Sequence, residues 1–278
     1  MFTRKPYTHS LFFNRNLNKK TTNNRYSDYV MVPGCPRFPT LHPGVDDTID
    51  YNKEMSIDHK ALIQMGEATI DTLLNADKKT CPKVLFLSTG EDNTIYEPHL
   101  LSSYIKKICD EKQYPFVLHI AGHGDPEKIG SIDPDSRIEI DLFADMLVQL
   151  FQGINPDKPI HVIFHTCNSA YADLNATMPK EMIKNIIQND TLIGKFSKAM
   201  KENGFNNITV TGYRGYYSHL ESHTGSVVTD DLSNSTKCTA EHTAVTICPK
   251  EGVILPKNDK HLFFEVNIAG KNYYNKLR

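Results

Sequence analysis

Short apolar segments rich in β-branched residues alternate with amphipathic segments between residues 83 and 212. Each apolar segment stops at glycine or polar residues, as buried strands of a parallel sheet do. The segments between them repeat apolar residues at helical spacing. This alternation predicts an α/β fold, a mostly parallel sheet with helices on both faces. The expected strands are 83–88, 116–121, 159–166 and 208–212, and the expected helices are 57–76, 98–112, 140–151 and 192–203.

The two ends of the chain differ from this central region. Residues 1–56 contain Pro33, Pro36, Pro39 and Pro43 among many polar residues. Because proline blocks helices and central strands, this segment is interpreted as an arm laid over the domain or a mobile leader. Residues 57–278 then form the α/β domain, in which residues from about 224 to 269 are expected to form a C-terminal antiparallel β extension. Its expected strands are 226–229, 243–248, 252–255 and 262–268.

Charge and composition restrict the classes of partner. The net charge of −2 predicts no nucleic-acid partner and no attraction to acidic membranes. No apolar run approaches the roughly 20 residues of a membrane-spanning helix, and no secretory signal is recognisable at the N-terminus. Six widely spaced cysteines indicate reduced thiols, hence a soluble protein of a reducing compartment such as the cytoplasm. The Asn- and Lys-rich composition without Trp suggests a bacterial protein, delivered into a host cell as an effector.

Two of the expected strands end on reactive side chains. Residues 116–121 run into Gly122-His123-Gly124, and 159–166 run into Cys167, 44 residues after His123. If the two strands are neighbours, their carboxyl ends meet at the sheet edge where α/β proteins bind ligands. An imidazole beside a thiol favours the reactive thiolate. The N–H of Gly124 and the backbone N–H groups after Cys167 are candidate donors to an oxyanion.

These two blocks, 116–124 and 160–169, resemble the caspase-like cysteine peptidases, which include caspases, legumain, clostripain, gingipains and toxin self-cleaving domains. The family has an apolar block ending in His-Gly and a second ending in Ala/Gly-Cys-x-Gly/Ser. The resemblance extends over about residues 83–215. It implies a caspase-like sheet and a cysteine endopeptidase acting on a protein or peptide substrate through a thioester. In that reaction Cys167 would be the nucleophile, His123 the acid, and Gly124 part of the oxyanion hole.

The resemblance also implies a pocket for the residue before the cut bond. Its walls would be the loop after the first strand, the residues before the cysteine, and the loop after the fourth strand. The corresponding residues are Glu91, Asp92, His165, Tyr213 and Arg214. The two acids would favour a basic substrate side chain, whereas Arg214 would favour an acidic one. No metal or organic cofactor is needed for this chemistry.

The chain departs from the family pattern near its cysteine. Thr166 replaces Ala or Gly, Ser169 replaces the commonest Gly, and His165 stands where several members carry an acidic residue or Gln. One alternative is therefore a non-catalytic binding or scaffold protein in which Thr166 hinders Cys167. A second alternative is another thiol-dependent acyl-transfer enzyme, such as a deamidase or acyltransferase.

A zinc site is a further alternative. Residues His119 and His123 on one strand, with His165 and Cys167 on the next, are nitrogen and sulfur ligands of the kind that zinc prefers. However, His119 lies in the middle of its strand, which favours a core histidine with satisfied hydrogen bonds. The sequence therefore predicts no metal.

Overall fold

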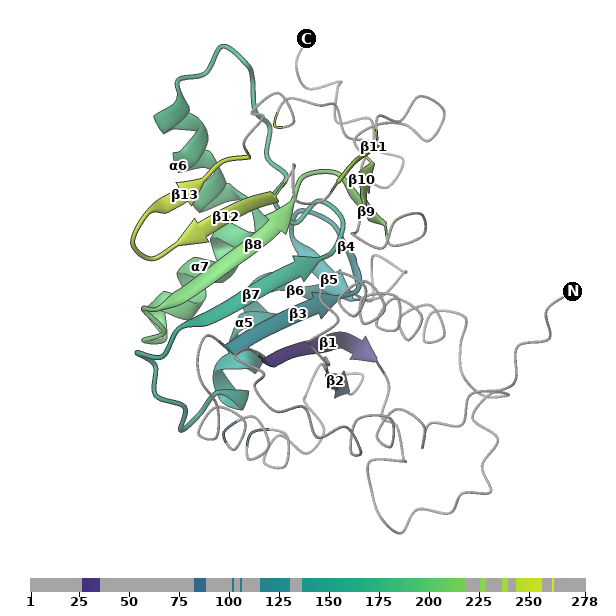
Figure 1. The fold of residues 1–278 in the computed structure, drawn as a ribbon, viewed down its shortest axis with the longest axis vertical. Helices are drawn as coiled ribbons and strands as arrows, with labels where there is room; N and C mark the ends of the chain where they lie inside the picture. Colours follow the sequence, from purple (N-terminus) through teal and green to yellow (C-terminus); the bar gives the residue numbers. More distant parts are fainter. Residues whose placement is uncertain are drawn as a thin grey trace, which may run out of the picture.

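A seven-stranded sheet forms the centre of the molecule, described by a computed structural model (Figure 1). The structure describes residues 27–35, 83–88, 102, 106, 116–130, 137–218, 226–228, 237–239, 244–256 and 262. The order of the strands across the sheet is β13-β12-β8-β7-β3-β1-β2. Their bounds are β1 Ser27–Cys35, β2 Lys83–Ser88, β3 Phe116–Ala121, β7 Ile160–His165, β8 Ile208–Tyr213, β12 Ala244–Cys248 and β13 Gly252–Ile254.

The prediction of a mixed α/β fold with a mostly parallel sheet is confirmed. The neighbours from β2 through β1, β3 and β7 to β8 all pair parallel. Beyond β8 the sheet continues with β12, which is antiparallel to it, and β13 forms an antiparallel pair with β12. All four strands expected between residues 83 and 212 are present, and β12 and β13 coincide with two of the later expected strands.

One part of the expected N-terminal arm is instead an internal strand, so the interpretation of residues 1–56 is wrong for Ser27–Cys35. This strand, β1, pairs with β3 on one side and with β2 on the other. Its centre, Tyr29-Val-Met-Val, has the aromatic and β-branched side chains that favour strands. Pairing with β3 ends at Met31. The missing N–H of Pro33 therefore removes no hydrogen bond to β3. The rest of residues 1–56 lies outside the described residues.

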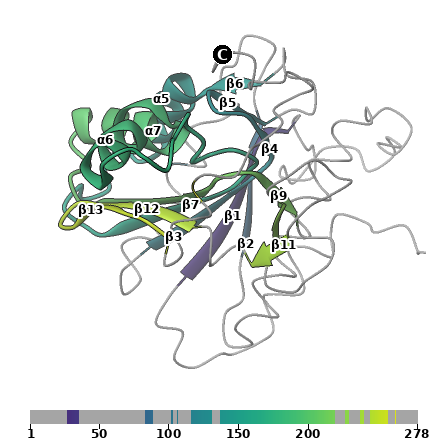
Figure 2. The same cartoon turned by 90° about the horizontal axis from the view of Figure 1, so that it is seen from above.

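The described long helices all cover one face of the sheet (Figure 2). They are α5 Ile140–Leu150, α6 Lys180–Asp190 and α7 Leu192–Glu202. Helices α5 and α7 confirm the predicted helices at 140–151 and 192–203, whereas α6 was not predicted. The expected helix at 57–76 lies outside the described residues. Within 98–112 only Ser102 and Lys106 are described, and both are helical. None of the described helices has the length and apolar character required to cross a bilayer.

Aromatic side chains join the helices to the strand that leads to the candidate nucleophile. Phe164 of β7 packs edge-on to Phe196 of α7, with ring centroids 5.0 Å apart, and lies 6.4 Å from the ring of Phe143 of α5. All three are fully buried, and truncating a core phenylalanine typically costs about 3–5 kcal/mol. The end of β7 is therefore anchored in the core.

Two small antiparallel sheets lie beyond the carboxyl ends of β3, β7 and β8 (Figure 1). One consists of β4 His123–Gly124, β5 Lys128–Gly130 and β6 Ile138–Glu139, and the other of β9 Tyr216–Ser218, β10 Ser226–Val228 and β11 Lys237–Thr239. β10 falls on the strand expected at 226–229. Leu262, expected to begin a strand, lies in a 3₁₀ turn, and residues 263–268 lie outside the described residues.

Candidate functional site

The backbone register brings His123 and Cys167 to the same edge of the sheet. Strands β3 and β7 pair parallel up to Ala121 opposite His165. His123 and Cys167 each follow two residues after that last pair, and each is half-buried. The two segments therefore leave the sheet side by side, and the prediction that their strands are adjacent and parallel is confirmed.

Gly124 is packed directly on the segment that carries the thiol. A Cβ atom added to Gly124 would lie 2.8 Å from the carbonyl oxygen of Cys167 and 2.9 Å from Cβ of Thr166. Both distances are shorter than real Cβ contacts, so only glycine fits here. The same residue pairs with Ile129 in the β4–β5 hairpin. The two blocks recognised in the sequence are thus in contact through backbone atoms.

The turn after Cys167 uses backbone N–H groups that the sequence analysis assigned to the oxyanion hole. Asn168 has a left-handed φ of 57° and donates its N–H to the carbonyl of Gly215, at 2.8 Å. Ala170 donates its N–H to the carbonyl of Tyr213, at 3.0 Å. Both donors are already used, so this part of the prediction is wrong for Asn168 and Ala170. Gly124 stays the predicted donor.

Ser169 links this turn to its neighbours in the fold. Its Oγ accepts the N–H of Tyr213 at 3.0 Å and lies 3.3 Å from the carbonyl oxygen of Thr166, to which it donates. Its carbonyl accepts the N–H of Ile193, at the start of α7. The serine that departs from the family's commonest glycine therefore stabilises the turn after Cys167 against β8 and α7.

Thr166 lies one residue beyond the end of β7, directly before Cys167. Its side chain is fully buried against Gly124. Its Oγ1 forms no hydrogen bond with the described part of the chain. Thr166 thus packs on the His123 loop.

His165 and His119 form a buried pair on the opposite face of the sheet. His119 Nδ1 lies 2.8 Å from His165 Nε2, a hydrogen bond in which one ring is the donor and the other the acceptor. His119 is 4% exposed, so the prediction of a core histidine is confirmed, and its Nδ1 has this hydrogen-bond partner. His165, expected in a substrate pocket, has only 5% of its surface exposed. It therefore lies beneath the edge that carries Cys167, not at the open surface.

The four candidate zinc ligands do not converge. Within the described residues, no three or more His, Cys, Asp or Glu side chains are grouped as metal ligands would be. His119, His123, His165 and Cys167 are among these described residues. Cys167 and Cys248, the two cysteines whose side chains are described, are half-buried and not in disulfides.

Tyr213 is a buried phenol at the end of β8. Its ring lies 6.0 Å from that of His165, and burial raises the pKa of Tyr213 well above its ordinary value. The expected pocket residue therefore stays a neutral side chain beside the buried histidine pair.

The pKa of Tyr213 gives an expected result at alkaline pH. Because the phenol ionises at about pH 10 in the unfolded chain and only at higher pH when folded, its contribution to stability is complete below pH 10. Above that it should decrease by about 1.4 kcal/mol per pH unit. Urea unfolding between pH 8 and 11 should therefore show a steeper loss of stability for the native chain than for Tyr213→Phe. Parallel curves would contradict this account.

Arg214 has a structural partner, contrary to its expected place in a substrate pocket. It is 5% exposed, and its Nη1 donates to the carbonyl of Ala172 at 2.6 Å. The guanidinium also stacks on the ring of Tyr171, 4.9 Å from its centroid. Arg214 therefore stabilises the loop after Cys167. Glu91 and Asp92, the other charged residues expected in the pocket, lie outside the described residues.

No protein-family model and no curated protein matches this chain. The geometry around His123 and Cys167 and the chemistry of their side chains are therefore the evidence for function.

Proposed function

We propose that this chain is a cysteine endopeptidase of the caspase-like type, with Cys167 as nucleophile and His123 as its acid–base partner. The main support for the proposal is that the two residues occupy equivalent positions after the ends of their strands. Each lies two positions beyond the last in-register pair of the adjacent parallel strands β3 and β7. A thiol and an imidazole at neighbouring strand ends are the two groups that covalent catalysis by cysteine requires.

In the proposed reaction the Cys167 thiolate attacks the carbonyl carbon of a peptide bond. A carbon–sulfur bond forms, and the carbonyl electrons move to the oxygen. When the oxyanion collapses, the carbon–nitrogen bond breaks and His123 gives its proton to the leaving amine. The product is a thioester. Water then attacks the thioester while His123 accepts a proton, and the thiolate leaves with the release of the new carboxyl end.

Gly124 supports the first step of this reaction. Its backbone lies against Thr166 and the carbonyl of Cys167, and the resemblance assigns its N–H to the oxyanion hole. A fixed N–H donor at such a position is worth about a hundredfold to a thousandfold in rate. The reaction uses only these protein groups and water, so no organic cofactor or metal is required.

A second line of support for the caspase-like assignment is the parallel part of the sheet. The resemblance implies a caspase-like sheet over about residues 83–215, and within that range β3, β7 and β8 are neighbouring parallel strands. We further propose Glu91, Asp92, His165 and Tyr213 as the surroundings of the substrate residue before the cut bond.

A covalent peptide probe tests the function. Peptidyl acyloxymethyl ketones with varied side chains next to the warhead should label the native chain at Cys167, as found by mass spectrometry of the digest. His123→Ala should lose the labelling, while Cys248→Ala, which removes the other described thiol, should keep it. A scaffold protein would not be labelled by any member of the set. A deamidase or acyltransferase would leave the peptide bonds of a peptide library intact.

A further inference from the structure

Asp125 closes the hairpin that carries His123. Its Oδ1 accepts the backbone N–H groups of Glu127 and Lys128, both at 2.9 Å. Its own backbone N–H donates to the carbonyl of Lys128, at 3.0 Å. These three hydrogen bonds form the turn between β4 and β5, and they begin two residues after His123.

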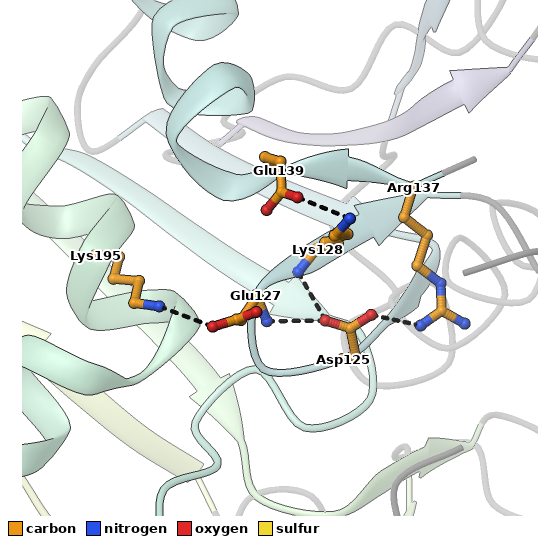
Figure 3. A network of polar contacts seen from close by, with 6 residues as sticks. All are labelled: Asp125, Glu127, Lys128, Arg137, Glu139 and Lys195. Atoms are coloured by element: carbon orange, nitrogen blue, oxygen red, sulfur yellow. Dashed lines mark hydrogen bonds and ion pairs between the residues drawn. The ribbon is translucent and has the colours of Figure 1, made fainter. Parts of the chain in front are cut away.

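Arg137 binds the same carboxylate from outside the hairpin. Its Nη1 lies 2.9 Å from Asp125 Oδ2, and the two side chains are 10% and 19% exposed (Figure 3). Arg137 directly precedes β6, which pairs with β5 and leads into α5. The ion pair therefore connects the turn after His123 to the strand and helix that follow it.

The other two ion pairs of this network are more exposed (Figure 3). Lys128 lies 2.7 Å from Glu139, and Lys195 lies 3.5 Å from Glu127, with side-chain exposures between 33% and 66%. Solvent-exposed pairs contribute little to stability, whereas a well-shielded, charge-assisted hydrogen bond fixes geometry more strongly. Within this network, Asp125 and Arg137 are therefore the pair suited to hold the hairpin in place.

The position of this hairpin determines the position of both candidate groups on it. Its first strand, β4, consists of His123 and Gly124, and Gly124 has no spare room against Thr166 and Cys167. A shift of the turn would therefore move the imidazole and the Gly124 N–H relative to the thiol. Misplacement of reacting groups by about 1 Å is enough to cost about a hundredfold in rate.

We propose that Asp125 and Arg137 are positioning residues of the candidate peptidase site, which hold His123 and Gly124 at the distance from Cys167 that the reaction needs. This inference depends on the proposed function. In this proposal the ion pair affects the rate of the chemical step and not substrate binding. The two side chains act through the hairpin backbone and touch no substrate.

The test compares Arg137→Gln, Arg137→Lys and Asp125→Asn with the native chain, using the best fluorogenic peptide from a library. For Arg137→Gln we expect kcat to fall about tenfold to a hundredfold while KM changes less than twofold. Arg137→Lys should recover most of the rate, because a single nitrogen–oxygen contact joins the two side chains. The matched control, Lys195→Gln, removes an exposed ion pair of the same network and should leave both constants unchanged.

Asp125→Asn is the second test if Arg137→Gln does not fold. Asparagine keeps the oxygen that accepts the turn N–H groups, but an amide NH2 group replaces the charged oxygen that accepts from Arg137. This variant should show the same selective loss of kcat. Folded variants with native kcat, or with a loss confined to KM, would overturn the inference. The alkylation rate of Cys167 by iodoacetamide separates this failure from that of the function. If His123→Ala leaves that rate and peptide hydrolysis unchanged, the proposed dyad is wrong whatever Arg137 does.

Discussion

Replacement of Cys167 by alanine is expected to lower kcat/KM for peptide hydrolysis by at least about 10⁴-fold. The substitution removes the sulfur atom that forms the thioester, and no other group in the mechanism replaces it. His123→Ala should cause a loss of similar size, because the two residues act as one unit, and such losses are strongly non-additive. The double variant should therefore be little worse than either single variant. Steady-state kinetics with a fluorogenic peptide measures all three.

The second described thiol provides the control for this prediction. Cys248 ends β12 and, like Cys167, is half-buried and outside any disulfide. Cys248→Ala should keep native kinetics. If Cys248→Ala lost activity while Cys167→Ala kept it, the nucleophile would be misassigned. If the losses for Cys167→Ala and His123→Ala simply multiplied in the double variant, the two residues would not act in one step.

The second large effect is expected for Gly124→Ala. The added Cβ would approach the Cys167 carbonyl oxygen to 2.8 Å and Thr166 Cβ to 2.9 Å, so the hairpin has to move away from β7. Overpacking of this kind typically costs about 1–3 kcal/mol of unfolding free energy. The accompanying shift of His123 should lower kcat by about a hundredfold. Chemical denaturation and steady-state kinetics of the same variant test both effects.

Gly122→Ala is the matched control, since Gly122 flanks His123 on the other side. The nearest atom to its added Cβ would be 3.5 Å away, on Gly130, which is an ordinary contact. This variant should keep native stability within about 0.5 kcal/mol and nearly native activity. Equal behaviour of the two glycine variants would show that the contact between Gly124 and the Cys167 segment does not constrain the site.

The elements nearest the candidate site were predictable because their local signals were strong. β3 and β7 are short runs of apolar and β-branched residues, and α5 and α7 have regular apolar spacing with many buried positions. α6 gave a weak signal because it buries only Ile183 and Ile187. In β1, residues Tyr29–Val32 favour a strand, but the nearby prolines led to the prediction of an arm. Pro33 lies beyond the part of β1 that pairs with β3.

Side-chain roles were harder to predict because they depend on contacts between distant segments. Arg214 looked like a charge available to substrate, but its partners are Ala172 and Tyr171, more than forty positions away. The pairing of Asp125 with Arg137 could not be predicted either, because it depends on how β5 and β6 align. The adjacency of the two strands that lead to His123 and Cys167 was predictable, because both strands are similar apolar runs that end on a reactive residue.

Trapping the acyl-enzyme shows whether Cys167 is the nucleophile. The native chain is mixed with a good peptide ester substrate, quenched in acid within milliseconds to seconds, digested and analysed by mass spectrometry. We predict that the acyl group of the substrate is attached to the peptide containing Cys167 and is released by hydroxylamine, and that His123→Ala greatly slows its formation. Turnover of the substrate with no adduct on Cys167, or with the acyl group on another residue, would contradict the account.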